Sequence, residues 1–297
     1  MALTINTNIS SLVAQNNLAK ATSSLNTAIE RMTTGYKINH ASDNAAGYSI
    51  ARNWETQLGS LDVAADNAAT GADMLTTLED TYALVTSHLQ RVRDLTEQAA
   101  NGTYGSQSLK AIQSEITARL EEVDRIAANC EFNGLKMMTG TMSDISIQVG
   151  LYGDDDSKIE LSNTLFAKGD VKSLFTTYGG MATGTTVEDI AEACSGYDNT
   201  NNKIVGGQSD MLTKIDDVIN QISARVTTLG AAQNRIDSAI ESIAVQSENI
   251  TSSLSTLRDT DIAEESSNYI QAQILQQAAA TLLSTANQTP SIALNLL

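Results

Sequence analysis

The most regular pattern of apolar positions lies in the C-terminal half, where such residues recur at alternating spacings of four and three. The series is Ile215, Ile219, Ile222, Val226, Leu229, Ile236, Ile240, Ile243, Ile250, Leu254 and Leu257. Only Gln233 and Ser247 interrupt it. A repeat of 3.5 residues keeps one stripe of a helix facing a partner over its whole length. The pattern predicts a helix ~65 Å long at 1.5 Å per residue, which must pack beside other long helices.

The N-terminal third also has a helical period. One face carries Leu18, Leu25, Ile29 and Met32, and later runs extend from Leu58 to Val92 and from Leu109 to Ile126. Gly35 and Asn39 predict a break, and residues 42–44 (Ser-Asp-Asn) predict a helix start. The third run is expected to stop near Asn133-Gly134. Residues 259–261 (Asp-Thr-Asp) predict the start of a last helix.

The centre of the chain has a different pattern. Residues 145–151 alternate between apolar and polar, and residues 159–161 do the same after an acidic turn at residues 154–156, which predicts a β-hairpin. A calcium loop is disfavoured there because the spaced acidic ligands, central Gly and distal Glu of an EF-hand are absent. Residues 176–207 are rich in Gly, Thr, Asn and Asp, apart from a helical patch at residues 187–194, and predict an exposed, variable insert. We predict a mainly α protein, an elongated rod of coiled-coil-like helices from both chain halves with a small central β-hairpin.

Composition narrows the possible functions. Aromatic residues make up only 4% of the chain and there is a single proline, which suits thin contacts between long uninterrupted helices. The formal net charge of −17 disfavours nucleic acid and anionic lipid headgroups as partners. No run of about 18 apolar residues predicts a membrane-spanning helix, and the N-terminus lacks the features of a cleaved export signal. We therefore expect a cytosolic protein or one exported by another route.

No catalytic motif stands out. His40 and His88 are in no metalloprotease pattern, and no nucleophile elbow, dinucleotide-binding glycine motif or phosphate-binding loop occurs. Cys130 and Cys194 lie 64 residues apart without a metal-binding spacing, so we interpret them as ordinary thiols. We expect no enzymatic activity, no cofactor and no metal.

Several motifs in order resemble those of the bacterial flagellins. They are residues 3–8 (LTINTN), 31–39 (RMTTGYKIN), 42–47 (SDNAAG), 229–235 (LGAAQNR), 272–278 (AQILQQA) and 286–288 (ANQ). The resemblance covers about residues 1–165 and 208–297, and the centre is short for the family. It implies a subunit of the flagellar filament, exported unfolded by the flagellar type III apparatus and found outside the cell. The implied partners are further copies of the chain, a secretion chaperone, and cap and junction proteins.

The resemblance also implies a domain organisation. Residues 1–42 and 259–297 would form a helical coiled coil in the filament core, whose apolar stripes stay disordered until assembly covers them. Residues 43–175 and 208–258 would form a helical rod with the hairpin near residues 145–161, and residues 176–207 would be the short variable insert. We expect Gln233 to be kept polar for subunit contact. The positions expected in polymerisation are Ile5, Ile9, Leu12, Leu25, Ile29, Gln233, Ile270, Ile274, Leu282, Leu294 and Leu297.

A further surface follows from the same resemblance. Seven residues correspond by motif to those through which some flagellins bind the host protein Toll-like receptor 5: Gln90, Arg91, Leu95, Gln98, Ile112, Glu115 and Arg119. Helical spacing supports part of this surface, because Arg91, Leu95 and Gln98 are four and three residues apart. The alternative is that the charged residues are solvated or contact other subunits, and that Leu95 serves packing.

Two other functions remain open at this stage. A hook–filament junction protein would share the helical termini and a similar length, although residues 276–277 and 286–288 favour the filament subunit. A secreted coiled-coil adhesin or effector would share the helical pattern alone.

Overall fold

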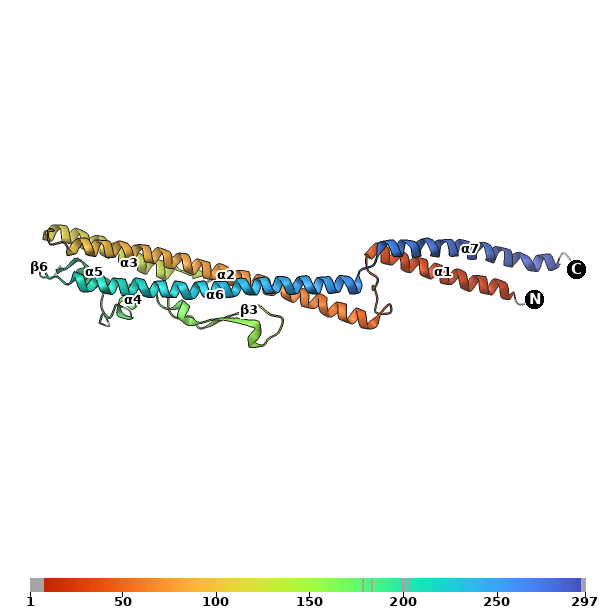
Figure 1. Cartoon of the computed structure of the whole chain (residues 1–297), viewed down its shortest axis with the longest axis horizontal. Coiled ribbons are helices and arrows are strands. Elements are labelled where there is room, and N and C mark those ends of the chain that lie inside the picture. Colours follow the sequence, from red (N-terminus) through yellow and green to blue (C-terminus); the bar gives the residue numbers. More distant parts are fainter. Residues whose placement is uncertain (1–7, 178, 183, 199–200, 202, 295–297) are drawn as a thin grey trace. The chain divides into compact units, whose positions relative to one another are not determined.

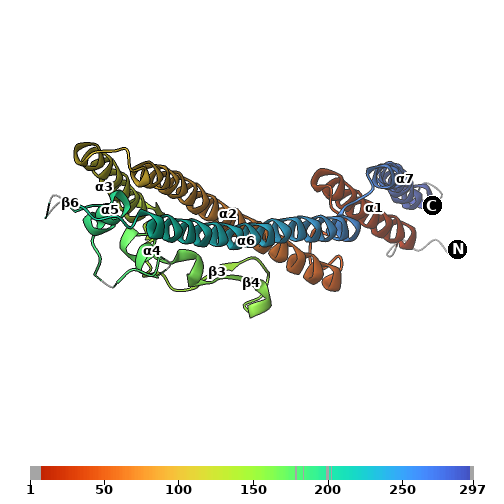
Figure 2. The ribbon, with the colours of Figure 1, turned by 60° about the vertical axis from the view of Figure 1, so that its left-hand side comes forward.

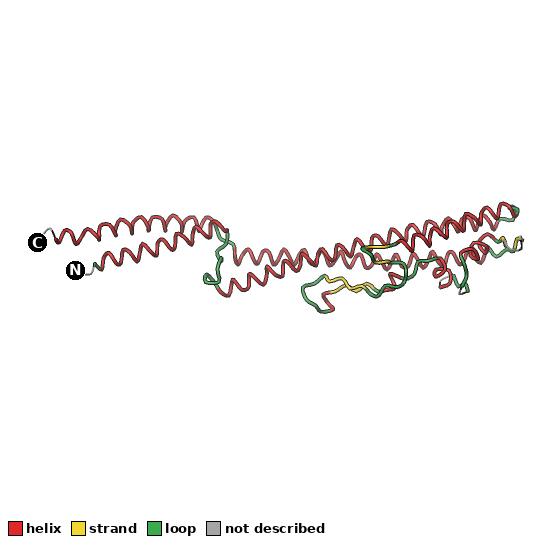
Figure 3. Tube along the Cα trace, turned by 180° about the vertical axis from the view of Figure 1, so that it is seen from behind, coloured by secondary structure: helices red, strands yellow, loops and turns green. Residues whose placement is uncertain are grey.

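A computed structural model of the 297-residue chain describes residues 8–177, 179–182, 184–198, 201 and 203–294, with side chains up to Gln288. The chain divides into two compact units. Unit 1 comprises residues 1–59 and 247–297, and unit 2 comprises residues 60–246. Helices dominate both units (Figure 3). The mainly α class, with long helices from both chain halves and a small central hairpin, is confirmed.

Four helices account for most of the chain: α1 (Ile9–Thr34), α2 (Ala45–Ala100), α6 (Gln208–Arg258) and α7 (Ile262–Leu294). Their starts follow the polar residues that the sequence indicates. The Asn44 side chain accepts a hydrogen bond from the Gly47 N–H, and Asp261 accepts one from the Ala263 N–H. Each satisfies a donor that the first turn of a helix leaves unpaired. α1 ends at Gly35, which has the left-handed φ of +77° typical of a helix C-terminus.

In unit 2, α2 lies beside α3 (Ser106–Asn129) and α6 (Figure 2). Both neighbours run antiparallel to α2. Arg91 and Gln98 of α2 contact Glu115 and Tyr104 respectively, and Glu79 and Arg93 of α2 contact Gln233 and Asp216 of α6 respectively. Large side chains fill the space between these helices. The most fully buried of them include Leu75, Leu78, Tyr82, Leu89, Ile116 and Leu120.

The long apolar stripe of α6 faces this core with one difference from prediction. Ile215, Ile222, Leu229, Ile236 and Ile243 are buried at intervals of seven, as expected. Between them, Val218 and Ala232 are buried, whereas Ile219, Val226 and Ile240 are only half-buried. The helix is therefore turned by about one residue from the orientation that the stripe predicts. Gln233 lies beside the core seam rather than within it.

Within the described residues, the β-structure consists of three short antiparallel pairs. β3 (Ile145–Gln148) pairs with β4 (Lys158–Leu161) and confirms the predicted hairpin, with Ile147 opposite Ile159. Its Ile147 side chain occupies the space left by Gly71 of α2, where any side chain would clash with it. β1 (Glu131–Phe132) and β2 (Leu135–Lys136) flank Asn133-Gly134, both at positive φ. This dipeptide thus forms a tight hairpin turn, and α3 ends earlier than predicted, at Asn129.

The predicted exposed insert is partly packed into unit 2. It contains α5 (Val187–Ser195), which matches the predicted helical patch, and the pair β5 (Tyr197–Asp198) and β6 (Lys203–Ile204), while α4 (Val171–Thr177) leads into it. Ile190, Cys194 and Tyr197 are at most 2% exposed. The prediction of exposure was therefore wrong for the apolar residues of α5, which fall on one face of the helix and cover the core. Residues 203–207 are exposed, as predicted.

Candidate functional site

α1 and α7 of unit 1 form an antiparallel pair that brings the two described chain ends to the same end of the pair (Figure 1). Asn8 Nδ2 donates a hydrogen bond of 2.7 Å to the Ala286 carbonyl. Gln276 Nε2 donates one of 3.1 Å to Thr22 Oγ1. The buried residues between the helices are small, and they recur every seven positions: Ala14, Ala21 and Ala28 on α1, and Ala272 and Ala279 on α7. We call these five residues the alanine seam.

Many of the larger apolar residues of this pair are exposed instead. Six of the residues that we predict to take part in polymerisation have side chains between 45% and 69% exposed: Ile9, Leu12, Ile29, Ile270, Ile274 and Leu282. We call these six residues the outer apolar set. Leu25 is half-buried. Ile5 and Leu297 are outside the described residues, and the side chain of Leu294 is not described either. A groove of about 680 Å³ runs along the pair and is lined in part by Ala21, Ala279 and Leu282.

The predicted receptor surface is only partly a surface. Arg91 and Arg119 both approach Glu115 Oε1, at 3.1 and 3.9 Å, and all three side chains are between 40% and 46% exposed. Gln90 and Gln98 are exposed, and Gln98 donates a hydrogen bond to the Tyr104 hydroxyl.

Leu95 and Ile112 do not belong to this exposed cluster. They are only 2% and 8% exposed because they pack in the core between α2 and α3. The expectation that Leu95 shares an exposed face with Arg91 was therefore wrong, and the packing alternative holds for it.

Gln233 has a partner within the chain. Its Nε2 donates a hydrogen bond of 2.9 Å to Glu79 Oε2 on α2, so the polar residue that interrupts the stripe links two helices of unit 2. Further along the same helices, Arg93 Nε lies 2.6 Å from Asp216 Oδ1, and this hydrogen bond raises the pKa of the guanidinium. These exposed and half-buried contacts orient the helices and contribute little to stability individually.

Sequence reasoning missed a polar cluster in unit 1 around Arg258. Its guanidinium stacks over the Tyr36 ring, 4.0 Å from the centroid, and forms an ion pair with Glu55. The backbone joins the same segments, because the Lys37 N–H donates to the Arg258 carbonyl and the Thr260 N–H donates to that of Gly35. This cluster connects the loop after α1 to the end of α6. The cluster forms only because segments far apart in the sequence pair, so no local sequence motif predicts it.

Neither cysteine forms a reactive site. Both thiols are free and buried, and burial raises the pKa of Cys194 to about 12. Asp43 has a lowered pKa, chiefly because its carboxylate accepts the His40 N–H. Within the described residues, no group of three His, Cys, Asp or Glu side chains is placed to hold a metal ion. No described helix is both long and apolar enough to cross a membrane.

Comparisons with known proteins identify the family. The model of the bacterial flagellin N-terminal helical region matches residues 5–143, and that of the C-terminal helical region matches residues 212–297. A flagellin of Xenorhabdus nematophila is 35% identical over 313 aligned positions, and polar flagellin F of Vibrio parahaemolyticus is 30% identical over 376, with all of each chain covered. The second alignment has 376 positions against 297 residues here, so at least 79 positions have no counterpart in this chain.

One solved structure adds to the comparison of folds. A putative flagellar hook-associated protein from Vibrio parahaemolyticus has a TM-score of 0.57 at 14% identity, and the match covers 73% of this chain and 100% of that one. It supports the fold alone. Together with the two family matches and the full-length relatives, the paired terminal helices and the central hairpin establish that this chain belongs to the bacterial flagellins, the structural subunits of the flagellar filament.

Proposed function

We propose that the chain polymerises through the outer apolar set of α1 and α7. The observation that supports this most directly is the reversal of burial within the pair, in which the five residues of the alanine seam are buried and the outer apolar set is exposed. Complete burial of one Ile or Leu side chain contributes about 1.5–3 kcal/mol. Covering several of them against neighbouring copies offsets the rotational and translational freedom lost on association. The contact must be heterologous, because a self-closing dimer cannot grow into a fibre.

The domain assignment of the sequence analysis is retained as part of this proposal. Residues 1–42 and 259–297 form the filament core, residues 43–175 and 208–258 surround it, and residues 176–207 form a small element of the outer part. Unit 1 also contains the start of α2 and the end of α6, which the ion pair of Arg258 with Glu55 joins. We further propose export through the flagellar type III apparatus, an extracellular location, and a secretion chaperone, cap and junction proteins as partners. Family membership supports these proposals.

The test is seeded polymerisation of the purified chain at high salt, followed by electron microscopy and sedimentation. The variant Ile274→Ser with Leu282→Ser removes two exposed side chains of α7 and should reduce the sedimented polymer at least tenfold while leaving helix content unchanged. The control is Val205→Ser, which removes an equally exposed apolar residue of unit 2. Normal filaments from the double variant would refute the proposed contact.

A hook–filament junction role is the second candidate, since the putative hook-associated protein has a similar fold. The full-length flagellin relatives favour the filament subunit. The same polymerisation experiment separates the two, because a junction protein would not form long homopolymers. A secreted adhesin would not be required for motility, so loss of motility on deletion, restored by this gene, would argue against that third role.

We also propose that the exposed cluster of Gln90, Arg91, Gln98, Glu115 and Arg119 binds Toll-like receptor 5. The cluster offers two guanidinium groups and one carboxylate on adjacent helices, which suits polar recognition by a protein surface. Leu95 and Ile112 would support the cluster from the core without touching the receptor. Arg91→Ala should weaken binding of the purified chain to the receptor ectodomain at least tenfold. Arg125→Ala, which removes an exposed arginine of α3, is the control, and equal affinity of both variants would refute this role.

A further inference from the structure

The alanine seam does not by itself specify how α1 and α7 are aligned. Its residues recur every seven positions on both helices, at 14, 21 and 28 and at 272 and 279. Sliding one helix by seven residues moves it by ~10.5 Å and again places alanine against alanine. Alanine side chains are all alike, so such a slip changes little of the packing inside the seam. Something else must distinguish the observed alignment.

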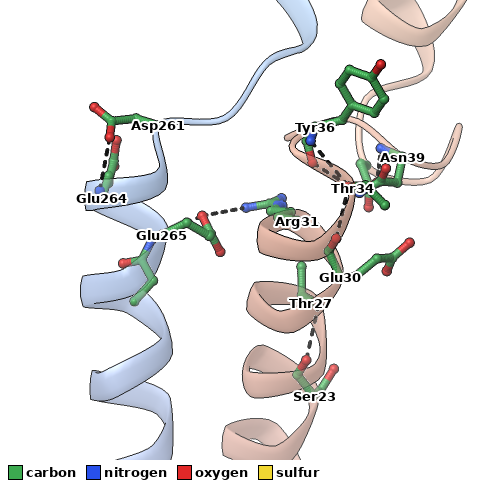
Figure 4. A network of polar contacts seen from close by, with 12 residues as sticks. Ser23, Thr27, Glu30, Arg31, Thr34, Tyr36, Asn39, Asp261, Glu264 and Glu265 are labelled. Atoms are coloured by element: carbon green, nitrogen blue, oxygen red, sulfur yellow. Dashed lines mark hydrogen bonds and ion pairs between the residues drawn. The ribbon is translucent and has the colours of Figure 1, made fainter.

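One seam position breaks the repeat. Glu265 lies seven residues before Ala272 and is buried in the same way, with 6% of its surface exposed. It is the only charged residue in the buried class within the described part of the chain. Its carboxylate is directed toward α1, where Arg31 Nη1 lies 3.8 Å from Oε2 (Figure 4). Among the described residues, the other side chain that contacts this carboxylate is Asn268, whose Nδ2 donates a long hydrogen bond of 3.4 Å.

Arg31 depends on this arrangement as well. Its side chain is 32% exposed, and its buried Nε has no hydrogen-bond partner among the described residues. If one helix slipped by seven residues, Glu265 would lie beside Ser24 instead of Arg31. The ion pair between Arg31 and Glu265 would then be lost. Leaving a buried charge uncompensated is costly, whereas a matched buried pair contributes little net stability. Fixing the register of paired helices is the best-attested role of a polar group at a single buried position.

We propose that Glu265 and Arg31 form a register key that selects one alignment of α1 and α7. The key decides which residues of the outer apolar set lie next to one another across the two helices, and hence the surface that the pair presents. It acts within one chain and does not rest on polymerisation. Its nearest competitor is the backbone pairing of Gly35 with Thr260, which also joins the ends of these helices.

Cross-linking measures the register directly at the far end of the pair. Ser11 Oγ donates a hydrogen bond of 2.7 Å to Asn287 Oδ1, so cysteines at these two positions report the observed alignment. Cysteine pairs at 11 and 280 and at 18 and 287 report slips of seven residues in the two directions. All variants carry Cys130→Ala and Cys194→Ala, so that only the introduced cysteines can form a disulfide. Disulfide formation in the full chain is followed at low protein concentration, once in dilute buffer and once at high salt. Intramolecular disulfides are read from mobility without reductant.

We expect the 11–287 pair to cross-link and the two slipped pairs not to. Glu265→Ala should lower cross-linking of the 11–287 pair at least fivefold and allow a slipped pair to form. Exchange of the charges, Arg31→Glu with Glu265→Arg, should restore the original pattern, which a purely space-filling role would not do. Glu264→Ala, an exposed neighbour, is the control. Unchanged 11–287 cross-linking in Glu265→Ala would show that the backbone pairing alone sets the register and would overturn the proposal.

Discussion

Long helices pack in opposite ways in the α1–α7 pair of unit 1 and in the helical core of unit 2. In unit 2, the fully buried side chains include Tyr82, Phe166 and Phe175. Between α1 and α7 the buried apolar residues are alanines, while the outer apolar set remains exposed. Because apolar burial scales with area, the second arrangement yields much less stability per turn of helix. Unit 2 therefore buries its large apolar side chains within the chain, whereas in our proposal α1 and α7 gain most of their stability from contacts of the outer apolar set with other copies.

The largest effect should come from truncating the core of unit 2. Leu89 is 0% exposed, so Leu89→Ala removes three buried carbons and leaves a cavity. We expect the free energy of unfolding of unit 2 to fall by about 3 kcal/mol. The measurement is hydrogen exchange of α2 and α3 peptides in the free chain. Leu84→Ala, on the exposed side of the same helix, should change it by less than about 0.5 kcal/mol. Equal effects would mean that the core is not where the structure places it.

An intermediate effect is expected from enlarging the alanine seam. Ala21 is 7% exposed between α1 and α7, and Ala21→Leu would push the two helices apart. Overpacking of this kind costs about 1–3 kcal/mol, which should be lost from the stability of the pair in the polymer. The matched control is Ala19→Leu, on the exposed side of α1. Melting of the polymer followed by circular dichroism reports the difference. If Ala21→Leu stabilises the pair, the seam is loosely packed and the comparison fails.

The smallest effect concerns the polar link of unit 2. Gln233→Leu removes the hydrogen bond to Glu79 at a half-buried site, so the free energy of unfolding should fall by less than about 1 kcal/mol. Gln221→Leu, an exposed position of the same helix, is the control. Urea unfolding of both variants is sufficient. A clear gain in stability would favour the interpretation in which Gln233 interrupts an otherwise apolar seam and serves contacts with other subunits.

Much of this architecture can be predicted from sequence periodicity. The period of α6 and the alternation of β3 and β4 identify both elements, and Asn44 and Asp261 mark helix starts because their side chains satisfy local donors. The orientation of α6 could not be predicted to within one residue, since Val218 and Ile219 are equally apolar and only packing distinguishes them.

The interior of the α1–α7 pair was missed for a different reason. The larger apolar residues Leu18 and Leu25 predict the contact face of α1. The helices meet instead through Ala14, Ala21 and Ala28. The signal was present as an alanine every seven residues. Contacts such as Arg31 with Glu265 join positions more than 200 residues apart, and nothing local in the sequence pairs them.

The central claim is that α1 and α7 are weakly held in the free chain and gain their stability from neighbouring copies. Hydrogen exchange of α1 and α7 peptides, compared between the free chain and the polymer, tests it most directly, with α2 and α6 peptides of unit 2 as the internal reference. We predict at least a hundredfold slower exchange of α1 and α7 in the polymer and little change in the reference peptides. Equal protection of α1 and α7 in both states would contradict the account.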